Sequence, residues 1–382
     1  MSVSHARPDA HTGDGEIPGL LSLLAAVPDP RRNRGRRFAL VFVLAVAVVA
    51  VLAGATNFRE VGDQAADLSQ RLLERLGGRR HPLKGAIVAP SEKRIRTLIQ
   101  QIDAAVLDEV IGGWLARLAA AGRMDGLLAA LAIDGKWLRG VEGVCLFSAM
   151  LQEDKVVIAQ RLIPDGTNEI TQVGELLDPI DLDGVVAGGD AAHAQHDTAH
   201  YLAAQRGADY FLTVKGNQPG LQAALFAKVQ ADCGPTADHI GTDTGHGRVV
   251  KRSIWVTNAD GIDFPHAAQI ARIRRDVYDL AGQHISKQIV HAITSLTADQ
   301  ANPDRLADLA QGQWGIESIH WIRDVVYRED DNTAYTGQGP QIMATLRNLA
   351  ISLLHLGGIT KIKATLQQIG RDRDRVLDVL PL

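Results

Sequence analysis

The sequence predicts an α/β fold, with a mixed β-sheet and flanking helices, a β-rich insertion, and an all-helical N-terminal domain. Three observations predict it. The spacing of apolar residues changes from helical to extended near Leu127. Beyond that point, strand-like and helical segments alternate, as they do in α/β proteins. The stretch from about residue 219 to residue 296 is mostly strand-like, and helical spacing resumes after it.

The first third of the chain is predicted to be helical. Residues 1–15 are rich in His, Asp, Gly and Ser, and we expect them to be disordered. In the domain at 16–122, the predicted helices cover Ile17–Ala26, Phe38–Ala53, Phe58–Leu76 and Ser91–Ala120. Residues 38–53 are an unbroken apolar run, but a membrane span needs roughly 20 residues. A buried helix is therefore favoured, and a membrane segment is the alternative.

The second predicted domain covers residues 123–360. Its strands are expected at Leu127–Ile133, Val144–Gln152, Lys155–Ile163, Val185–Gly188 and Tyr210–Val214, with helices at Glu169–Leu177 and Asp197–Arg206. The insertion, about 219–296, has a first helix and strands at Arg248–Val256, His266–Val277 and His284–Ile293. Further helices are expected at Pro303–Gln311, Trp314–Tyr327 and Gln341–Leu356, and a C-terminal tail helix within 361–382.

Composition restricts the function only weakly. The chain has 382 residues, of which 46% are hydrophobic and 22% charged, the balance of a globular protein. The formal net charge of −4 does not indicate nucleic-acid binding, so such a function has to rest on local basic patches. Cys145 and Cys233 lie far apart in sequence, which favours a reduced, cytoplasmic protein.

Two aspartates each follow an apolar strand. Asp134 ends the run from Leu127, and Asp190 ends the run from Val185. If the two strands are neighbours, the carboxylates lie side by side at the sheet edge where α/β proteins bind ligands. Such like charges are costly unless a cation lies between them, and hard oxygen ligands suit Mg²⁺ or Mn²⁺. The alternative is that each Asp only caps the following turn.

A third carboxylate has two candidates. Glu317 lies early in a predicted helix, on a polar stripe with His320 and Asp324, opposite a core-facing apolar side. The alternative third acid, Glu329, lies in an acidic stretch at the predicted end of that helix, which is more typical of a solvated terminus. Glu317 is therefore favoured.

The chain resembles the H-repeat-associated insertion-sequence transposases, a family of DDE transposases with an RNase H-like catalytic core. The matching segments run through nearly the whole chain in family order. They are LLAAVPDPRRNRGRRFAL, LAGATNF, PSEKRIRTLI, AIDGKWLRG, the TNEI of Thr167–Ile170, GGDAAHAQ, ADYFLTVKGNQ, HGRVVKR, WGIESIHWIRDVVYRED and LRNLAISLL. A single short match such as DGK carries little weight, but this ordered set is specific.

The resemblance implies a DNA transposase whose catalytic and metal-binding residues are Asp134, Asp190 and Glu317, with two Mg²⁺ or Mn²⁺ ions. It also implies hydrolysis at the element ends, transfer of the freed 3′-hydroxyl to target DNA, a homodimer on double-stranded DNA, and association with the bacterial nucleoid. In the superfamily pattern Y-x2-R-x3-E-x6-K, Glu317 fits, but Ala310, Gln313 and Asp324 replace the Tyr, Arg and Lys.

Local basic and polar residues are the candidates for DNA contact. They are Arg31, Arg32, Arg34, Arg36 and Arg37, then Lys136, Lys215 and Asn217 after strands, and Arg248 in the insertion. His193, His196 and His200 could bind zinc, although an exposed polar face is favoured. No GxxxxGK[ST] motif is present, so no nucleotide cofactor is expected. A nuclease without strand transfer, a catalytically inactive DNA-binding relative and a membrane-anchored protein are the rival functions.

Overall fold

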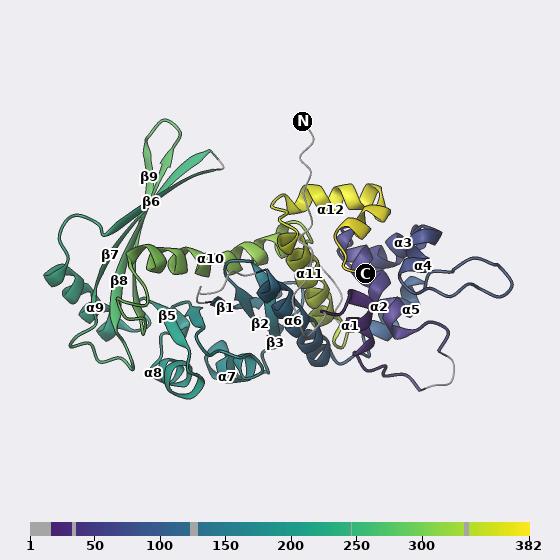
Figure 1. Ribbon diagram of the computed structural model, residues 1–382, viewed down its shortest axis with the longest axis horizontal. Coiled ribbons are helices and arrows are strands. Elements are labelled where there is room, and N and C mark those ends of the chain that lie inside the picture. Colours follow the sequence, from purple (N-terminus) through teal and green to yellow (C-terminus); the bar gives the residue numbers. More distant parts are fainter. Residues whose placement is uncertain (1–16, 33–35, 123–128, 246, 332–335) are drawn as a thin grey trace.

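The computed structural model describes residues 17–32, 36–122, 129–245, 247–331 and 336–382. The molecule is elongated, with a helical body at one end, a β-rich extension at the other and the central sheet between them (Figure 1). In the central part, Asp134 lies in a strand, Asp190 directly follows another strand and Glu317 lies in a helix.

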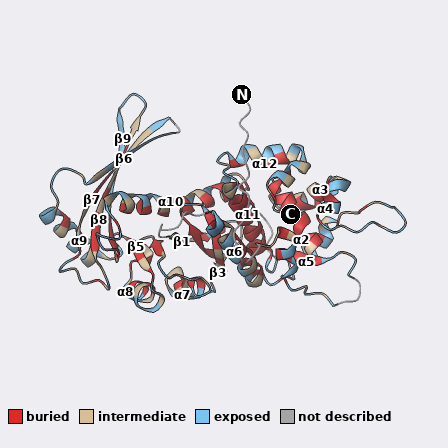
Figure 2. Ribbon diagram, viewed as in Figure 1, coloured by how far each residue is buried: buried red, intermediate tan, exposed pale blue. Residues whose placement is uncertain are grey.

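The helical body surrounds one apolar helix. Its elements are α1 (Leu20–Ala25), α2 (Leu40–Leu52), α3 (Phe58–Ala66), α4 (Gln70–Arg75), α5 (Glu92–Ile99) and α6 (Ala104–Ala121). Helix α2 is buried nearly throughout because α1, α3, α5 and α11 pack around it. The interpretation of residues 38–53 as a buried helix is thus confirmed (Figure 2). Among the described residues, every helix is too short or too polar to cross a membrane.

The predictions of uninterrupted helices over 58–76 and 91–120 are wrong, because new helices begin inside each range. Ser69 accepts a hydrogen bond from the Leu72 amide and caps α4. Asp103 accepts hydrogen bonds from the amides of Ala105 and Val106 and caps α6. Both residues compete with a continuing helix by bonding the free amides of a new first turn.

The C-terminal segment returns to the helical body. It contains α12 (Ile362–Arg371) and the 3₁₀ helix η5 (Arg373–Asp378). The Leu20 amide donates to the Pro381 carbonyl at 2.7 Å, and the Ser69 hydroxyl donates to Asp374 at 2.6 Å. The two ends of the described chain therefore stabilise the same body.

The central sheet contains β1 (Ala130–Trp137), β2 (Cys145–Leu151), β3 (Val156–Leu162), β4 (Val186–Gly189) and β5 (Asp209–Val214). Their order is β3-β2-β1-β4-β5. The first three strands are antiparallel, and β4 and β5 run parallel to β1. The crossovers carry the 3₁₀ helix η1 (Glu169–Gln172) with α7 (Val173–Leu177), then η2 (Ala191–His193), α8 (His196–His200) and the π-helical η3 (Tyr201–Gln205). This is the predicted RNase H-like arrangement.

The insertion extends the same sheet. It contains α9 (Pro219–Asp232), β6 (His239–Gly245), β7 (Arg248–Asn258), β8 (Gln269–Asp279) and β9 (His284–Thr294). Because β9 pairs antiparallel with β5, the result is one sheet of nine strands. The sequence did not predict β6, whose residues are mostly polar and exposed. The insertion is β-rich, as predicted.

Helix α10 (Pro303–Val325) is continuous, so the prediction of two helices at 303–311 and 314–327 is wrong. Gly312 and Gly315 weaken the helical pattern of the sequence, because glycine disfavours a helix interior. In the structure Gly312 permits close packing, since a Cβ at this position would lie 2.1 Å from Oε1 of Gln152. Helix α11 (Gly339–Leu356) is buried between α2, α6 and β3.

A buried polar network joins α6, β3 and α11. Asp108 accepts hydrogen bonds from Gln160 Nε2 at 3.2 Å, Gln341 Nε2 at 2.8 Å and Thr345 Oγ1 at 2.5 Å. Burial raises the pKa of Asp108 from 3.8 to about 7, although these hydrogen bonds oppose the rise. The protonated carboxyl is therefore the main form in the folded protein below about pH 7.

We expect Asp108→Asn to remove a pH dependence of stability. The pKa of Asp108 is higher in the folded state than in the unfolded chain, so the protonated carboxyl favours folding. This contribution to stability is complete below about pH 4 and is lost as the pH rises to about 7. Urea unfolding of D108N should show a smaller fall in unfolding free energy between pH 4 and 7 than the parent chain. Glu109→Gln, an exposed neighbour, is the control. An unchanged slope in D108N would mean that Asp108 stays ionised across this range.

Candidate active site

The two predicted aspartates occupy adjacent positions at the C-terminal end of β4. Strands β1 and β4 are parallel neighbours, and their register places Ile133 opposite Gly189. Asp134 and Asp190 are the residues that follow Ile133 and Gly189. Asp134 does not end its strand, as the sequence suggested, because β1 continues to Trp137 along β2. Asp134 lies instead directly after the last residue of β1 that pairs with β4.

Both aspartates also accept local backbone hydrogen bonds. Oδ1 of Asp190 accepts from the Ala192 amide at 2.9 Å and caps η2. Oδ1 of Asp134 accepts from the Gly135 amide at 3.0 Å. The turn-capping alternative is therefore correct for Asp190 as a local description. It is compatible with ligand binding, because a carboxylate retains further lone pairs.

Glu317 is carried to the aspartates by α10. One turn earlier on this helix, Gln313 donates from Nε2 to the Ile133 carbonyl at 3.2 Å and fixes the helix against β1. Gly188 makes room for this contact, because a Cβ there would lie 2.6 Å from Oε1 of Gln313. Glu317, Asp134 and Asp190 line one pocket of about 100 Å³. The pocket is also lined by Thr213, Lys215, Ile273, Gln288, Val290, Ala310, Gln313, Trp314 and Ile316.

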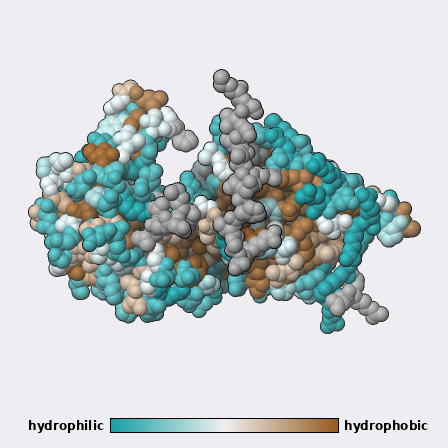
Figure 3. Space-filling view, viewed as in Figure 1, coloured by the Kyte–Doolittle hydropathy of each residue, from teal (hydrophilic) through white to brown (hydrophobic). Residues whose placement is uncertain are grey.

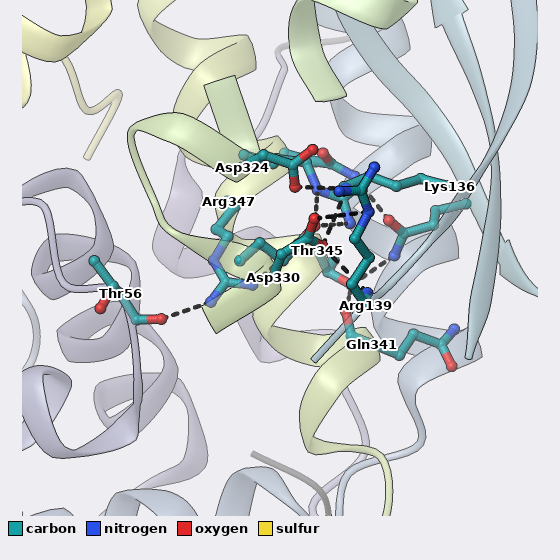
Figure 4. Close-up of polar contacts among 12 residues, drawn as sticks. Thr56, Lys136, Arg139, Asp324, Asp330, Gln341, Thr345 and Arg347 are labelled. Carbon is teal, nitrogen blue, oxygen red and sulfur yellow. Dashed lines mark hydrogen bonds and ion pairs between the residues drawn. The ribbon is translucent and has the colours of Figure 1, made fainter. Parts of the chain in front are cut away.

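Glu329, the alternative third acid, lies elsewhere. It is 3% exposed, and its two carboxylate oxygens pair with Arg323 at 2.7 Å and Arg347 at 2.6 Å. Arg347 also donates to the Thr56 carbonyl at 2.6 Å (Figure 4). The two arginines hold the pKa of Glu329 below its ordinary value against the effect of burial. Glu329 thus joins α10 and α11 to the loop before α3, and it does not line the acidic pocket.

The pocket is electrostatically unfavourable for a carboxylate. Burial, together with the neighbouring charges of Glu169, Asp190 and Glu317, raises the pKa of Asp134 to about 7. Nδ1 of His320 lies 3.5 Å from Oδ2 of Asp134. Burial, with Arg323 and Lys136 nearby, lowers the pKa of His320 to about 3, so this imidazole is neutral and does not supply a compensating charge.

The predicted DNA contacts after the strands lie in different settings. Lys215 is exposed and lines the acidic pocket. Lys136 is buried, and its ammonium pairs with Asp324 at 2.6 Å and Asp330 at 3.6 Å (Figure 4). Because its charge faces these carboxylates, Lys136 is not presented to a ligand in this structure. Asn217 donates to the Ala191 carbonyl at 2.6 Å and holds the turn after Asp190. Arg248 is exposed at the start of β7.

The arginines at 31–37 border a basic depression. Arg31 pairs with Asp29 at 2.8 Å and Arg36 with the same carboxylate at 3.4 Å. Arg32 and Arg37 are exposed, and Arg34 lies outside the described residues. Arg31 and Arg37 line a pocket of about 480 Å³ together with Phe38, Val43, Ser91, Lys93, Arg94, Thr97, Leu98 and Gln101. Lys93 and Arg94, distant in sequence, thus join the predicted basic cluster.

The three histidines after Asp190 do not share one face. His193 is buried and stacks on Phe147 with ring centroids 5.3 Å apart, whereas His196 and His200 are exposed. Throughout the described part of the chain, no three His, Cys, Asp or Glu side chains are already arranged to hold a metal ion. The zinc interpretation therefore has no support. The three acids of the pocket line it without converging on one point.

Sequence reasoning assigned no role to Glu169, yet this residue lies beside Asp134. A Cβ on Gly135 would lie 2.1 Å from Oε1 of Glu169. The only indication in the sequence that Glu169 has a role was that the TNEI segment is part of the family resemblance. Its own helix is too short for apolar spacing to show which face a side chain takes.

An RNase H-like sheet with three acids in a pocket beside β1 and β4 defines a class of candidate nucleic-acid-processing proteins. Comparison with known families is more specific. The model of the transposase DDE domain matches residues 133–353, and the DDE_Tnp_1-associated model matches residues 21–115. The chain belongs to the transposase DDE domain family.

Individual relatives agree with this assignment. The chain is 27% identical to a putative transposase YncI of Escherichia coli O157:H7, over 88% of this chain and 87% of that one. It is 25% identical to the H repeat-associated putative transposase YhhI of Escherichia coli K12, over 96% and 98%. An uncharacterized protein in the dhlA 3′ region of Xanthobacter autotrophicus is 31% identical over 65% of this chain and 83% of its own.

Among solved structures, a piggyBac transposase synaptic complex with hairpin DNA aligns with 93% of this chain and 77% of its own. Its TM-score is 0.40 and its sequence identity 11%, too low to add to the family assignment.

Proposed function

We propose that the chain is a DNA transposase that hydrolyses phosphodiesters at the ends of an insertion element and joins the freed 3′-hydroxyl to target DNA. One observation carries the proposal: Asp134 on β1, Asp190 directly after β4 and Glu317 on α10 line one pocket in a chain of the transposase DDE domain family.

The donor set fits a hard divalent cation. The three side chains offer only carboxylate oxygens, which suit Mg²⁺ or Mn²⁺. Burial and the charges of the neighbouring carboxylates raise the pKa of Asp134, and a bound cation would offset both effects. Asp134, Asp190 and Glu317 are the residues that would hold such ions. When bound, such ions lower the pKa of water and stabilise the charge that develops on a phosphate during its displacement reaction.

The chain's own residues would supply positioning. Gln313 keeps α10, and with it Glu317, at a fixed distance from β1. Lys215 at the pocket brings one positive charge to the place where a scissile phosphate would approach. Neutral His320 packs beside Asp134 without competing as a cation.

DNA backbone binding is assigned to the basic depression of the helical body. Arg37, Lys93 and Arg94 are exposed and line it, and none of the described residues that line it is acidic. Hydrophilic residues border much of the helical body in Figure 3. We expect a dimer on two element ends, as the family resemblance implies.

The double variant K93A/R94A should bind double-stranded DNA more weakly, and equally so for any sequence. The plot of log affinity against log salt concentration should become shallower by about one for each lost phosphate contact. Fluorescence anisotropy across a salt series measures this slope. K361A/K363A, which removes two exposed lysines from the α12 region, is the matched control. An unaltered slope in K93A/R94A would place the DNA on another face.

The activity is tested with the element-end DNA and Mg²⁺. A transposase gives 3′-hydroxyl nicks followed by joined products. A nuclease of the same fold gives nicks alone, and an inactive DNA-binding relative gives a gel shift without cleavage. Either of the last two results would contradict the proposed function.

A further inference from the structure

Glu169 packs against β1 next to the acidic pocket, although it is not among the residues that line the pocket. It lies at the start of η1, where Asn168 caps the turn by accepting from the Thr171 amide at 3.2 Å. Its carboxylate rests directly on Gly135, the residue after Asp134, at a distance that no side chain at Gly135 would permit. The fold thus brings a fourth carboxylate next to the first predicted acid.

The surroundings of Glu169 do not satisfy its charge. Its side chain is 23% exposed, and within the described residues no donor reaches its carboxylate at hydrogen-bond distance. A partly buried carboxylate without a protein donor carries a desolvation cost that a cation or another donor would offset.

His193 is aimed at this carboxylate and has no other partner. It is fully buried, and neither ring nitrogen has a hydrogen-bond partner within the described structure. Its Nε2 lies 3.6 Å from Oε2 of Glu169. Stacking on Phe147 fixes the ring, and Gly189 leaves no room for a Cβ, which would lie 2.9 Å from the His193 Cβ. His193 follows Asp190 by three residues, so it ties Glu169 to the second acid.

We propose that Glu169 is a fourth carboxylate ligand of the divalent-cation site and that His193 positions it. The inference rests on the proposed function, because it concerns the same candidate cation site. It explains why a glycine follows Asp134 and why a wholly buried imidazole lacks a hydrogen-bond partner within the described residues. A bound cation would neutralise Glu169 together with Asp134.

The test is direct Mn²⁺ binding to the full chain, measured by isothermal titration calorimetry and by the loss of the free-ion paramagnetic resonance signal. Glu169→Gln should weaken Mn²⁺ affinity by about tenfold or more, a loss expected for a ligand or its close support. Glu175→Gln is the matched control, because Glu175 lies on α7 just beyond η1 and pairs with Arg161 at its surface. The Glu175→Gln variant should bind Mn²⁺ with the affinity of the parent chain.

Two further variants keep the outcome decisive. His193→Phe retains the ring that stacks on Phe147 and removes the nitrogen facing Glu169, so it should weaken Mn²⁺ binding less than Glu169→Gln does. Asp134→Asn should abolish binding. If Asp134→Asn abolishes binding while Glu169→Gln and His193→Phe match the parent, this inference is overturned and the proposed function stands. If Asp134→Asn binds Mn²⁺ normally, the metal site of the proposed function fails.

A purely structural role for Glu169 gives a different pattern in thermal unfolding. It would lower the melting temperature equally with and without Mn²⁺. The proposed role predicts that Glu169→Gln melts at or above the parent temperature without metal, because a repelling charge is removed, and gains less from added Mn²⁺.

Discussion

A Glu317→Gln variant should remain folded and lose at least roughly 1,000-fold in the rate of DNA cleavage, because one ligand of the charge-stabilising ions is gone. Glu317 is exposed at the pocket, so its loss removes no buried contact. Single-turnover cleavage of labelled element-end DNA, with thermal unfolding alongside, measures both properties.

The matched control is Asp308→Asn, which changes an exposed carboxylate of the same helix away from the acidic pocket. It should cleave DNA at the parent rate. A Glu317→Gln variant that cleaves within a few-fold of the parent would remove Glu317 from the catalytic residues, whatever the state of its fold.

A Glu329→Gln variant should fail in the opposite way, through stability. It leaves the buried guanidinium groups of Arg323 and Arg347 without a counter-charge. Breaking one side of a buried ion pair costs about 3–5 kcal/mol of unfolding free energy. Chemical denaturation should show that loss, whereas Asp331→Asn, an exposed neighbour paired with Arg328, should change it little. A stable Glu329→Gln variant with lost cleavage would reverse the assignment of the two glutamates.

The contrast between the two glutamates shows where sequence reasoning has its limits. The position of Glu317 followed from helical spacing and the family pattern. The sequence also suggested that Glu329 was solvated, because its neighbours Asp330 and Asp331 are acidic. That interpretation is wrong: Arg347, on α11, reaches it across the core. A partner distant in sequence leaves no trace in local spacing.

The positions of the strands in the sheet were predictable, because apolar runs and turn residues are local features of the sequence. Asp134 and Asp190 follow such runs, and parallel neighbours place their ends together. Lys136 shows the opposite case. It follows Asp134 closely in sequence, but Asp324 and Asp330 capture its ammonium. Asp324 occupies the position where the superfamily pattern has a lysine. The unexpected aspartate at this position and the unexpected burial of Lys136 therefore belong to the same ion pair.

Glu169 could not be assigned from the sequence because its role depends on two glycines. Gly135 admits its carboxylate to β1, and Gly189 fixes the place of His193. Neither contact follows from spacing or composition. Both arise from the close packing of η1 and η2 beside the end of β4.

The most direct test of the acidic pocket is a crystal of the chain with element-end DNA and Mn²⁺, analysed by anomalous scattering. Divalent ions should appear between Asp134, Asp190 and Glu317, at roughly 2.0–2.3 Å from carboxylate oxygens and against a DNA phosphate. Manganese found only at other residues, with these three carboxylates uncoordinated while DNA occupies the pocket, would contradict the proposed catalytic site.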